Sequence, residues 1–556
     1  MKRPLLTAWF VGAALAVLMT WPMMSAPGSL TRMDTHDGKF SVWNVGWVAH
    51  ALTADPGNLF NANIFHPHTG TLAYSEANLV AGAVAAPVYA VTGNPILAHN
   101  IVVYMALVLA FVLTWQLVRR LTGSDWAGYP PAAAFAFSAY VSAHTAHIQL
   151  LLVFVVPMVL LVWHWFADAP SARRGAGLGA TLTVAVLACA YYGIMMGLAV
   201  GFAALWFARG QAAPRRYWMG LASAVIVAAM TVAPVAVPYA ALRDQGMRDT
   251  LNVDEARSFS ADHRAYMRGH SGPLTRLLPT GLRSSIDTYV GRTGEVLFPG
   301  LIVVALAIIG LAAVSRVSGR DVGGFYLALT MVALWASMGP RAGLYVWLAD
   351  VIPFMSFLRA PARFGVLVLC GLAVFGGWGM AVLLQRVRGA AVVVTAVVVL
   401  ATVAEARVAW PLRPVPPVPD AYRLLAGLPR DGTVVLHFPY RSGEWFPHVE
   451  HMFWSMWHWQ PLVNGYSDHI PQDVIDLAIP INSFPSEEAF GILRARDVRY
   501  VAIDWRTYNE AATSIMRSRF PPFAPYLREL FRGDDVSLYE IVAWPVGAST
   551  AVEPVR

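Results

Sequence analysis

Two polar stretches near the N-terminus, TRMDTHDGKFSVWN (31–44) and NIFHPHTGTLAYSEAN (63–78), decide how the rest of the chain is interpreted. They carry acidic side chains, histidines and tryptophans, whereas the sequence on both sides of them is strongly apolar. The two stretches begin and end one polar loop, 31–78. Such a long polar loop between apolar runs is costly unless it stands in water and has a function there. We therefore expect the functional residues of the chain to gather around this loop.

The composition is typical of a membrane protein. Of the 556 residues, 57% are hydrophobic and 13% are charged, whereas about a quarter of the residues are charged in soluble domains. The formal net charge of +7 comes from arginines in short groups beside apolar runs, which indicates membrane topology rather than nucleic-acid binding. The two cysteines, Cys189 and Cys370, lie inside apolar runs, so we expect neither a disulfide framework nor a cysteine zinc site.

The apolar runs predict a polytopic α-helical membrane protein with about 11 transmembrane helices, because a helix needs about 20 apolar residues to cross the bilayer. The expected spans are 5–26, 96–118, 128–143, 148–166, 176–190, 193–208, 217–237, 297–315, 323–338, 364–384 and 390–406. With this count every basic group beside a span falls on one side, which the positive-inside rule makes cytoplasmic. The N-terminus is then cytoplasmic, and the arginine-rich, lysine-poor composition suggests a bacterial inner (plasma) membrane.

Two segments are harder to thread through the membrane. The run at 79–93 breaks the charge pattern if it is a span, and it is short with Pro87 in its middle, so we expect an interfacial helix there. The spans at 176–190 and 193–208 have the alternative of one broken, re-entrant pair around Tyr191-Tyr192-Gly193.

The chain therefore divides into a transmembrane domain, 1–406, and a C-terminal tail, 407–556. The transmembrane domain holds two long external loops, 31–94 and 238–295. The tail begins with a proline-rich linker and then alternates expected strands and helices, which predicts an extracytoplasmic α/β domain. It contains no phosphate-binding glycine motif and no GxSxG nucleophile motif.

Four stretches of the tail carry this prediction. TVVLHFP (433–439) and VSLYEIV (536–542) are expected strands, and EEAFGILRARDVRYVAID (487–504) is an expected helix followed by a strand. HVEHMFWSMWHWQ (448–460) is an expected amphipathic helix. Its aromatic residues either pack the domain onto the membrane face or form a platform for a sugar or a lipid headgroup.

Carboxylates at the two ends of the first loop are the candidate catalytic residues. Asp37 and Glu76 can supply a base that takes a hydroxyl proton and a second acid or ligand. Asp34 stands nearby, but Asp37 is better placed because a lysine and two tryptophans follow it with helical spacing. Asp34 fits the role of an N-cap or loop residue.

Basic residues and histidines are expected on the same side. Arg359 and Arg363, four residues apart before the span at 364–384, suit a phosphate or pyrophosphate, with interfacial anchoring as the alternative. The candidate substrate-binding residues are His66, His68, His144, His147 and Glu295. The four histidines and Glu76 could instead hold a divalent metal, although single histidines at an interface are more often simply hydrogen-bonded. No cofactor follows with certainty.

The chain resembles the GT-C superfamily of membrane glycosyltransferases, which includes protein O-mannosyltransferases and aminoarabinose transferases. The motifs that carry the resemblance are HDGKFSVWNVGW (36–47), NIFHPHTGTLAYSE (63–76), SAHTAHIQ (142–149), GEVLFPG (294–300), FLRAPARF (357–364) and HWQPLVNGYS (458–467). Members have an acidic residue early in a long first external loop, juxtamembrane helices in that loop and often a C-terminal extracytoplasmic domain.

This resemblance implies that Asp37 is the general base and that a sugar moves, with inversion, from a polyprenyl-phosphate donor. The neighbouring Asp34, and Gly38-Lys39 directly after Asp37, depart from the pattern of the superfamily, so the choice between the two aspartates stays open. The acceptor is a lipid, a glycan or a protein.

Two other classes of protein are alternatives. One is a transporter or flippase for a glycolipid, and the other is a non-catalytic assembly protein of the cell envelope. Transporters usually show internal repeats and charged residues inside their spans, and this sequence has no clear repeat and almost no ionisable residue in mid-span. We expect membrane lipids, but no nucleic acid, among the partners.

Overall fold

The computed structural model describes residues 2–243, 252–267, 279–280, 296–317, 320–352, 355, 358–387, 389–429, 433–440 and 446–548. The chain forms two compact units. The first comprises Met1–Pro27, Asn78–Ala81 and Asn100–Pro411. The second comprises Gly28–Ala77, Gly82–His99 and Leu412–Arg556, so the first loop and the tail belong to the same unit.

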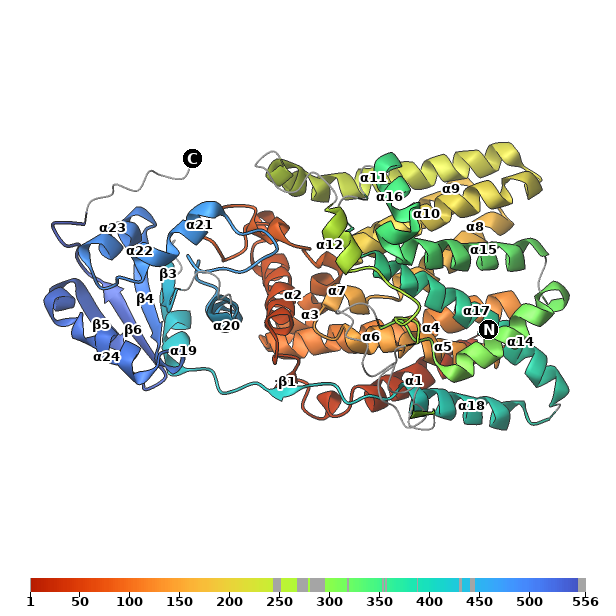
Figure 1. Ribbon diagram of the computed structural model, residues 1–556, viewed down its shortest axis with the longest axis horizontal. Coiled ribbons are helices and arrows are strands. Elements are labelled where there is room, and N and C mark those ends of the chain that lie inside the picture. The colour runs from red at the N-terminus through yellow and green to blue at the C-terminus, as the bar shows by residue number, and fades with distance from the viewer. Residues whose placement is uncertain are drawn as a thin grey trace. The chain divides into compact units, whose positions relative to one another are not determined.

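The first unit is built from helices (Figure 1). They are α1 (Lys2–Met19), α4 (Pro95–Thr122), α5 (Tyr129–Ala136), α6 (Ala139–Ala143), α7 (Ile148–Leu151), α8 (Val155–Asp168), α9 (Ala172–Ala188), α10 (Ala190–Phe207), α11 (Pro214–Arg243), α12 (Val253–Ser258), α14 (Leu301–Val317), α15 (Arg320–Ser337), α16 (Leu344–Val351), α17 (Gly365–Arg386) and α18 (Ala391–Ala406).

Every expected span overlaps a helix, but two spans are interrupted. The expected span at 128–143 is divided into α5 and α6, because Ser138 caps a new helix by accepting a hydrogen bond from Val141 N. The expected span at 148–166 is divided into α7 and α8. The break between α9 and α10 lies at Cys189, whose backbone is extended. The run at 79–93 forms α3 (Leu79–Thr92), with Pro87 inside the helix.

Within the described residues, four helices are long and apolar enough to cross a membrane: Pro95–Thr122, Ala190–Gly210, Pro214–Leu242 and Pro361–Arg386. The shorter apolar helices are Arg3–Met19, Leu79–Thr92, Val155–Asp168, Leu301–Val314, Asp321–Ser337 and Ala391–Ala406. These helices make the chain a multi-pass membrane protein. The count of 11 crossings stays a prediction.

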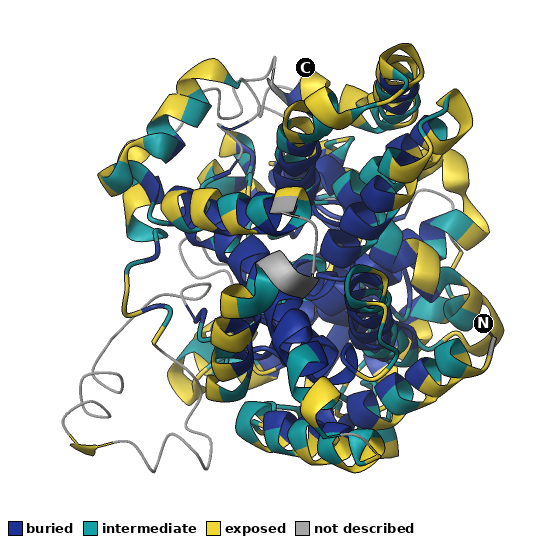
Figure 2. Ribbon diagram, turned by 90° about the vertical axis from the view of Figure 1, so that its right-hand side faces the viewer, coloured by how far each residue is buried: buried dark blue, intermediate teal, exposed yellow. Residues whose placement is uncertain are grey.

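Small residues let the helices of the first unit approach closely. A Cβ added at Gly175 of α9 would lie 1.9 Å from the carbonyl oxygen of Gly220 in α11, and one at Gly310 of α14 would lie 1.9 Å from that of Phe375 in α17. Figure 2 shows helices with buried inner faces and exposed outer faces. Of the apolar stretch of α11 only 11% is buried, so this helix presents an apolar surface outward, as lipid contact requires.

The second unit contains a four-stranded mixed sheet. Its strands are β3 (Val434–Phe438), β4 (Val498–Asp504), β5 (Leu527–Phe531) and β6 (Val536–Ile541), in the order β3-β4-β6-β5. β3 and β4 are parallel, and the other pairs are antiparallel. The tail helices are α19 (Asp420–Gly427), α20 (Phe446–Ser455), α21 (Gln472–Asp476), α22 (Ala478–Ile481), α23 (Glu487–Ala495) and α24 (Glu510–Ser518).

The strands expected at 433–439 and 536–542 are confirmed, as is the helix followed by a strand expected over 487–504. The helix expected in 448–460 is confirmed as α20. β5 was not predicted. It is the edge strand, its residues are exposed or half-buried, and its sequence, LRELF, lacks the long apolar run that marks the buried strands.

The first loop is attached to the tail along its length. β1 (Leu30–Thr31) pairs antiparallel with β2 (Arg413–Pro414). Main-chain hydrogen bonds join Phe65 N to Asn464 O, at 3.2 Å, and Leu462 N to Asn63 O, at 3.0 Å. α2 (His36–Ala54) also packs beside α20 (Figure 1). The tail therefore fixes the helix that carries the predicted catalytic carboxylate.

Candidate functional site

Asp37 lies in the first turn of α2. Thr35 is the N-cap residue, and its hydroxyl accepts a hydrogen bond from Gly38 N at 3.1 Å. A carboxylate in the first turn of a helix is stabilised by the helix dipole. A Cβ at Gly38 would lie 2.5 Å from the carbonyl oxygen of Arg32, so the chain before α2 folds back too closely for any other residue. This packing accounts for the glycine directly after Asp37.

Asp34 has a different setting. Its Oδ1 lies 2.6 Å from Nε of Arg32, in an ion pair within the loop that precedes α2. Since Thr35 takes the cap position, Asp34 is a loop residue, which is one of the two roles that the sequence allowed for it. The two neighbouring aspartates therefore differ in position: Asp37 lies in the first turn of the helix and Asp34 in the loop before it.

The other polar residues of α2 hold the first loop. Asn44 Nδ2 donates to the main-chain oxygen of Glu76 at 3.2 Å, Trp43 Nε1 donates to Asn63 Oδ1 at 3.2 Å, and Trp47 Nε1 donates to Leu59 O at 2.9 Å. The helically spaced tryptophans that favoured Asp37 are therefore structural clamps. Asn44 places the main chain of Glu76 against the helix that carries Asp37.

His66 and His68 face residues of the tail. His68 Nε2 lies 2.9 Å from Oδ1 of Asp473, and Asp473 Oδ2 accepts from Nη2 of Arg496 at 3.0 Å. Burial raises the pKa of the Asp473 carboxyl, but the hydrogen bonds from His68 and Arg496 outweigh it and hold this pKa below its usual value. Burial also lowers the pKa of His66, whose Nε2 is buried without a hydrogen-bond partner among the described residues.

Arg359 and Arg363 meet at one tyrosine in the first unit. The main-chain N–H of Arg359 donates to the hydroxyl of Tyr191 at 3.0 Å, and the guanidinium of Arg363 lies 4.0 Å from the centre of the Tyr191 ring. The Arg359 side chain also lies 3.7 Å from Oε1 of Glu255. Residues Pro361–Phe364 form a 3₁₀ turn before α17, so Tyr191, rather than an α-helical face, brings the two arginines together.

Tyr191 and Glu255 were not among the predicted site residues. For Tyr191 the sequence did carry a signal, since the Tyr191-Tyr192-Gly193 segment marked an expected break between apolar runs. For Glu255, in the predicted loop 238–295, which is rich in charged residues, we find no signal that separates it from its neighbours.

His144 and His147 lie in the same unit as Tyr191. His144 is buried and its Nδ1 lies 2.7 Å from Tyr140 O. The hydroxyls of Tyr140 and Tyr192 are 3.1 Å apart, and the rings of His144 and His147 are 6.2 Å apart. His144 therefore has the hydrogen-bonded setting that was the alternative to metal binding. Glu295, the remaining predicted residue, lies outside the described residues.

A metal is not supported by the part of the chain that the structure describes. There, no group of three or more His, Cys, Asp or Glu side chains is placed to hold a metal ion. His68 Nε2 instead lies beside Oδ1 of Asp473.

The aromatic residues of α20 are internal. His448, His451 and Trp454 have no exposed surface, and Trp454 stacks on Tyr422 with 5.9 Å between the ring centres. An exposed platform for a sugar or lipid headgroup at these residues is therefore wrong. They form part of the core of the second unit.

No protein-family model and no curated protein sequence matches the chain. Solved structures do match. The arabinofuranosyltransferase AftD from Mycobacteria is similar with a TM-score of 0.58 and 16% identity, over 98% of this chain and 40% of AftD. This chain thus spans less than half the length of AftD. The Archaeoglobus fulgidus oligosaccharyltransferase gives a TM-score of 0.47 at 13% identity, over 97% of this chain and 73% of that protein.

ArnT from Cupriavidus metallidurans, solved with undecaprenyl phosphate bound, gives a TM-score of 0.41 at 13% identity, with 97% of this chain and 98% of ArnT covered. At these identities the similarity shows the fold alone, and this conclusion rests on the match to AftD. All three are glycosyltransferases of the GT-C type. The fold of this chain is similar to that of AftD, a glycosyltransferase of the GT-C type.

Proposed function

We propose that the chain is an inverting membrane glycosyltransferase, with Asp37 as general base and a polyprenyl-phosphate sugar as donor. The acceptor is a hydroxyl of a lipid, glycan or protein on the extracytoplasmic side of a bacterial inner membrane. The observation that carries the proposal is the placement of Asp37 in the first turn of a clamped helix, within a chain of GT-C fold.

The chemistry requires a base on the acceptor side. The Asp37 carboxylate takes the proton of the acceptor hydroxyl while the acceptor oxygen bonds to the anomeric carbon. The bond from that carbon to the phosphate oxygen breaks on the opposite face, and its electron pair leaves with the lipid phosphate. Attack opposite to the leaving group inverts the configuration at the anomeric carbon.

The leaving phosphate gains negative charge that the enzyme must stabilise. We assign this role to Arg359 and Arg363. Tyr191 fixes both, through the main chain of one and the guanidinium of the other, and 41% of the Arg359 side chain is exposed and available to a ligand. One guanidinium group can donate two parallel hydrogen bonds to the oxygens of a phosphate, whereas an ammonium acts as a point charge. Arginine therefore suits this task better than lysine would.

Acceptor binding is assigned to residues of the second unit. Glu76, held against α2 by Asn44, is the second acid, and His66 and His68 beside Asp473 offer hydrogen bonds to a polar acceptor. We extend the assignment to His144, His147 and Glu295 as further substrate contacts. No step is assigned to a metal.

The decisive experiment is transfer by the purified chain from a panel of radiolabelled polyprenyl-phosphate sugars to extracted envelope acceptors. Asp37→Asn keeps the shape of the side chain, so it should fold and yet lower transfer by roughly 100-fold to 10,000-fold. Asp34→Asn is the matched control and should retain transfer within a few fold.

Loss of transfer in Asp34→Asn with activity in Asp37→Asn would move the base to Asp34. Movement of a labelled lipid across vesicles without sugar transfer would instead identify a flippase. The absence of transfer and of lipid movement with every donor and acceptor would favour an assembly protein.

A further inference from the structure

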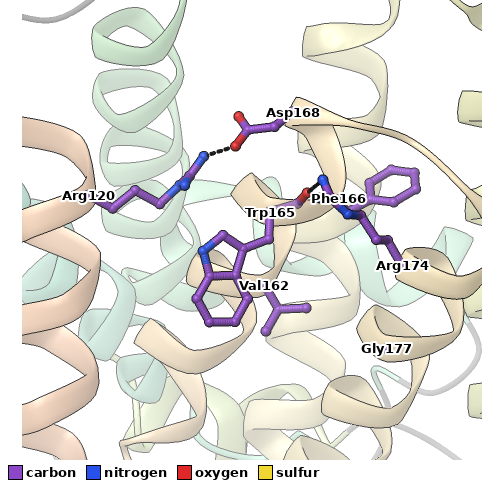
Figure 3. Close-up of a pocket in the computed structure, with 7 residues that line it drawn as sticks. All are labelled: Arg120, Val162, Trp165, Phe166, Asp168, Arg174 and Gly177. Carbon is purple, nitrogen blue, oxygen red and sulfur yellow. Dashed lines mark hydrogen bonds and ion pairs between the residues drawn. The ribbon is translucent and has the colours of Figure 1, made fainter. Parts of the chain in front are cut away.

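A cavity of about 560 Å³ opens in the first unit where α4 ends, α8 ends and α9 begins. Figure 3 shows the side chains that line it. They are Arg120, Val162, Trp165, Phe166, Asp168, Arg174 and Gly177. The cavity is therefore apolar and aromatic in part, with three charged side chains.

The charges of the cavity leave one positive charge in excess. Arg120 forms an ion pair with Asp168, and the two side chains point toward each other (Figure 3). Arg174 Nη1 donates to the main-chain oxygen of Trp165 at 2.7 Å, and no carboxylate of the described residues forms an ion pair with it. The guanidinium of Arg174 has further N–H groups to offer. Two arginines and one aspartate complement a ligand with a single negative charge.

The surroundings indicate the level of lipid headgroups. Trp165 is 46% exposed, and Trp218, on the neighbouring α11, is 49% exposed. Exposed tryptophans and arginines at helix ends are typical of the boundary between membrane and water. α9 packs closely on α11, which presents its apolar surface outward. A ligand here has an apolar surface on one side and water on the other.

We propose that this cavity binds the phosphodiester headgroup of an anionic glycerophospholipid, with Arg174 and Arg120 as donors to the phosphate oxygens. Basic pockets between transmembrane helices on the cytoplasmic side bind anionic headgroups. The predicted topology places these helix ends on the cytoplasmic side, so the lipid comes from the cytoplasmic leaflet. A phosphodiester carries one negative charge, which balances the excess positive charge of the cavity. The apolar rim suits the glycerol and acyl ester region of the lipid.

The chain offers a clean way to close the cavity. Gly177 lines it, and a Cβ at this position would meet nothing within 4 Å, so Gly177→Leu fills empty space without displacing a neighbour. Gly197 in α10 is also an exposed helical glycine whose Cβ would meet nothing within 4 Å, but it does not line the cavity. Gly197→Leu is therefore the matched control.

The test is native mass spectrometry of the purified full-length chain with equal concentrations of phosphatidylglycerol and phosphatidylcholine. We expect phosphatidylglycerol adducts to exceed phosphatidylcholine adducts about fivefold. This is the difference in affinity expected from one basic residue near an anionic headgroup. Gly177→Leu and Arg174→Gln should both remove this preference, through shape and through charge, whereas Gly197→Leu should keep it.

Equal binding of the two lipids by the wild-type chain would overturn the proposal, as would a preference that survives in both Gly177→Leu and Arg174→Gln. A further arm adds glycerol 3-phosphate in excess. Displacement of phosphatidylglycerol by this soluble anion would show a site for free phosphates rather than for a membrane lipid. Retention of the lipid supports the headgroup site.

Discussion

The ammonium group of Lys39 in α2 donates to Oε2 of Glu450 in α20, and the two side chains form a nearly buried ion pair. Their exposed fractions are 8% and 14%. The second oxygen, Oε1 of Glu450, accepts from Trp454 Nε1 at 2.8 Å. Through this ion pair the tail holds the helix whose first turn carries Asp37. The contact accounts for a lysine two residues after the proposed base.

Removing one partner of this pair should destabilise the chain. Lys39→Met leaves the Glu450 carboxylate buried without its counter-charge, at a cost of about 3 kcal/mol in the free energy of unfolding. Thermal unfolding of the full-length chain in detergent measures the loss. The double variant Lys39→Met with Glu450→Leu should recover much of it, because both charges are then gone.

The control for that experiment is an exposed ion pair. Arg423 and Asp420 lie 3.7 Å apart with 64% and 74% of their side chains exposed. Arg423→Gln should change the free energy of unfolding by less than about 1 kcal/mol. A loss in Lys39→Met no larger than the loss in Arg423→Gln would contradict the role given to Lys39.

Gly38 should not tolerate a side chain. Gly38→Ala would place a methyl group 2.5 Å from the main-chain oxygen of Arg32, and that clash should cost about 1–3 kcal/mol and displace the first turn of α2. Gly57→Ala is the control in the same loop, because its Cβ would meet only Asp55 Oδ1 at an ordinary 3.7 Å. Thermal unfolding and sugar transfer should both fall for Gly38→Ala and stay near wild type for Gly57→Ala.

The arginines at Tyr191 give a prediction about donor binding. Arg363→Lys keeps the charge but loses the planar group that lies over the ring, so kcat/KM for the donor should fall about fivefold or more. Arg341→Gln, at an exposed position of the 3₁₀ turn Gly339–Ala342, is the control and should leave kcat/KM unchanged. Full activity in Arg363→Lys would show that the guanidinium has no part in holding the donor.

Much of the fold could be predicted because lipid and burial constrain local sequence. Spans follow from apolar runs, since a backbone in lipid must satisfy its hydrogen bonds within a helix. The buried strands β3 and β6 follow from their apolar runs. The edge strand β5 escaped because exposed positions carry no such pattern.

The candidate site could be predicted only in part. Asp37, Arg359 and Arg363 stood out as charged residues beside apolar runs, but the contacts between the first loop and the tail did not. Lys39 and Glu450 are 411 positions apart, and His68 and Asp473 are 405 apart. The sequence around each of these residues does not indicate its partner, so the attachment of the first loop to the tail appears only in the folded chain.

Buried histidines in the tail should make the chain sensitive to acid. His437 and His451 have no exposed surface, and their ring centres are 4.7 Å apart. Burial, together with the neighbouring histidines, holds the pKa of each well below the ordinary value of 6.5. The charged group that acts on this pair from outside the histidine cluster is Arg506, which also disfavours the protonated form of His451.

Because the folded state keeps these rings neutral, the unfolded state takes up their protons first as pH falls. Stability should be level above pH 6.5 and then drop by about 1.4 kcal/mol per pH unit for each histidine. Unfolding of the full-length chain by urea, followed by tryptophan fluorescence between pH 7.5 and pH 5, measures this slope. His437→Leu should reduce the slope by the contribution of one histidine, about 1.4 kcal/mol per pH unit. The substitution removes no side-chain hydrogen bond of the described residues. His36→Gln, at an exposed position, is the matched substitution, and a slope that changes equally in both variants would contradict the assignment to the buried pair.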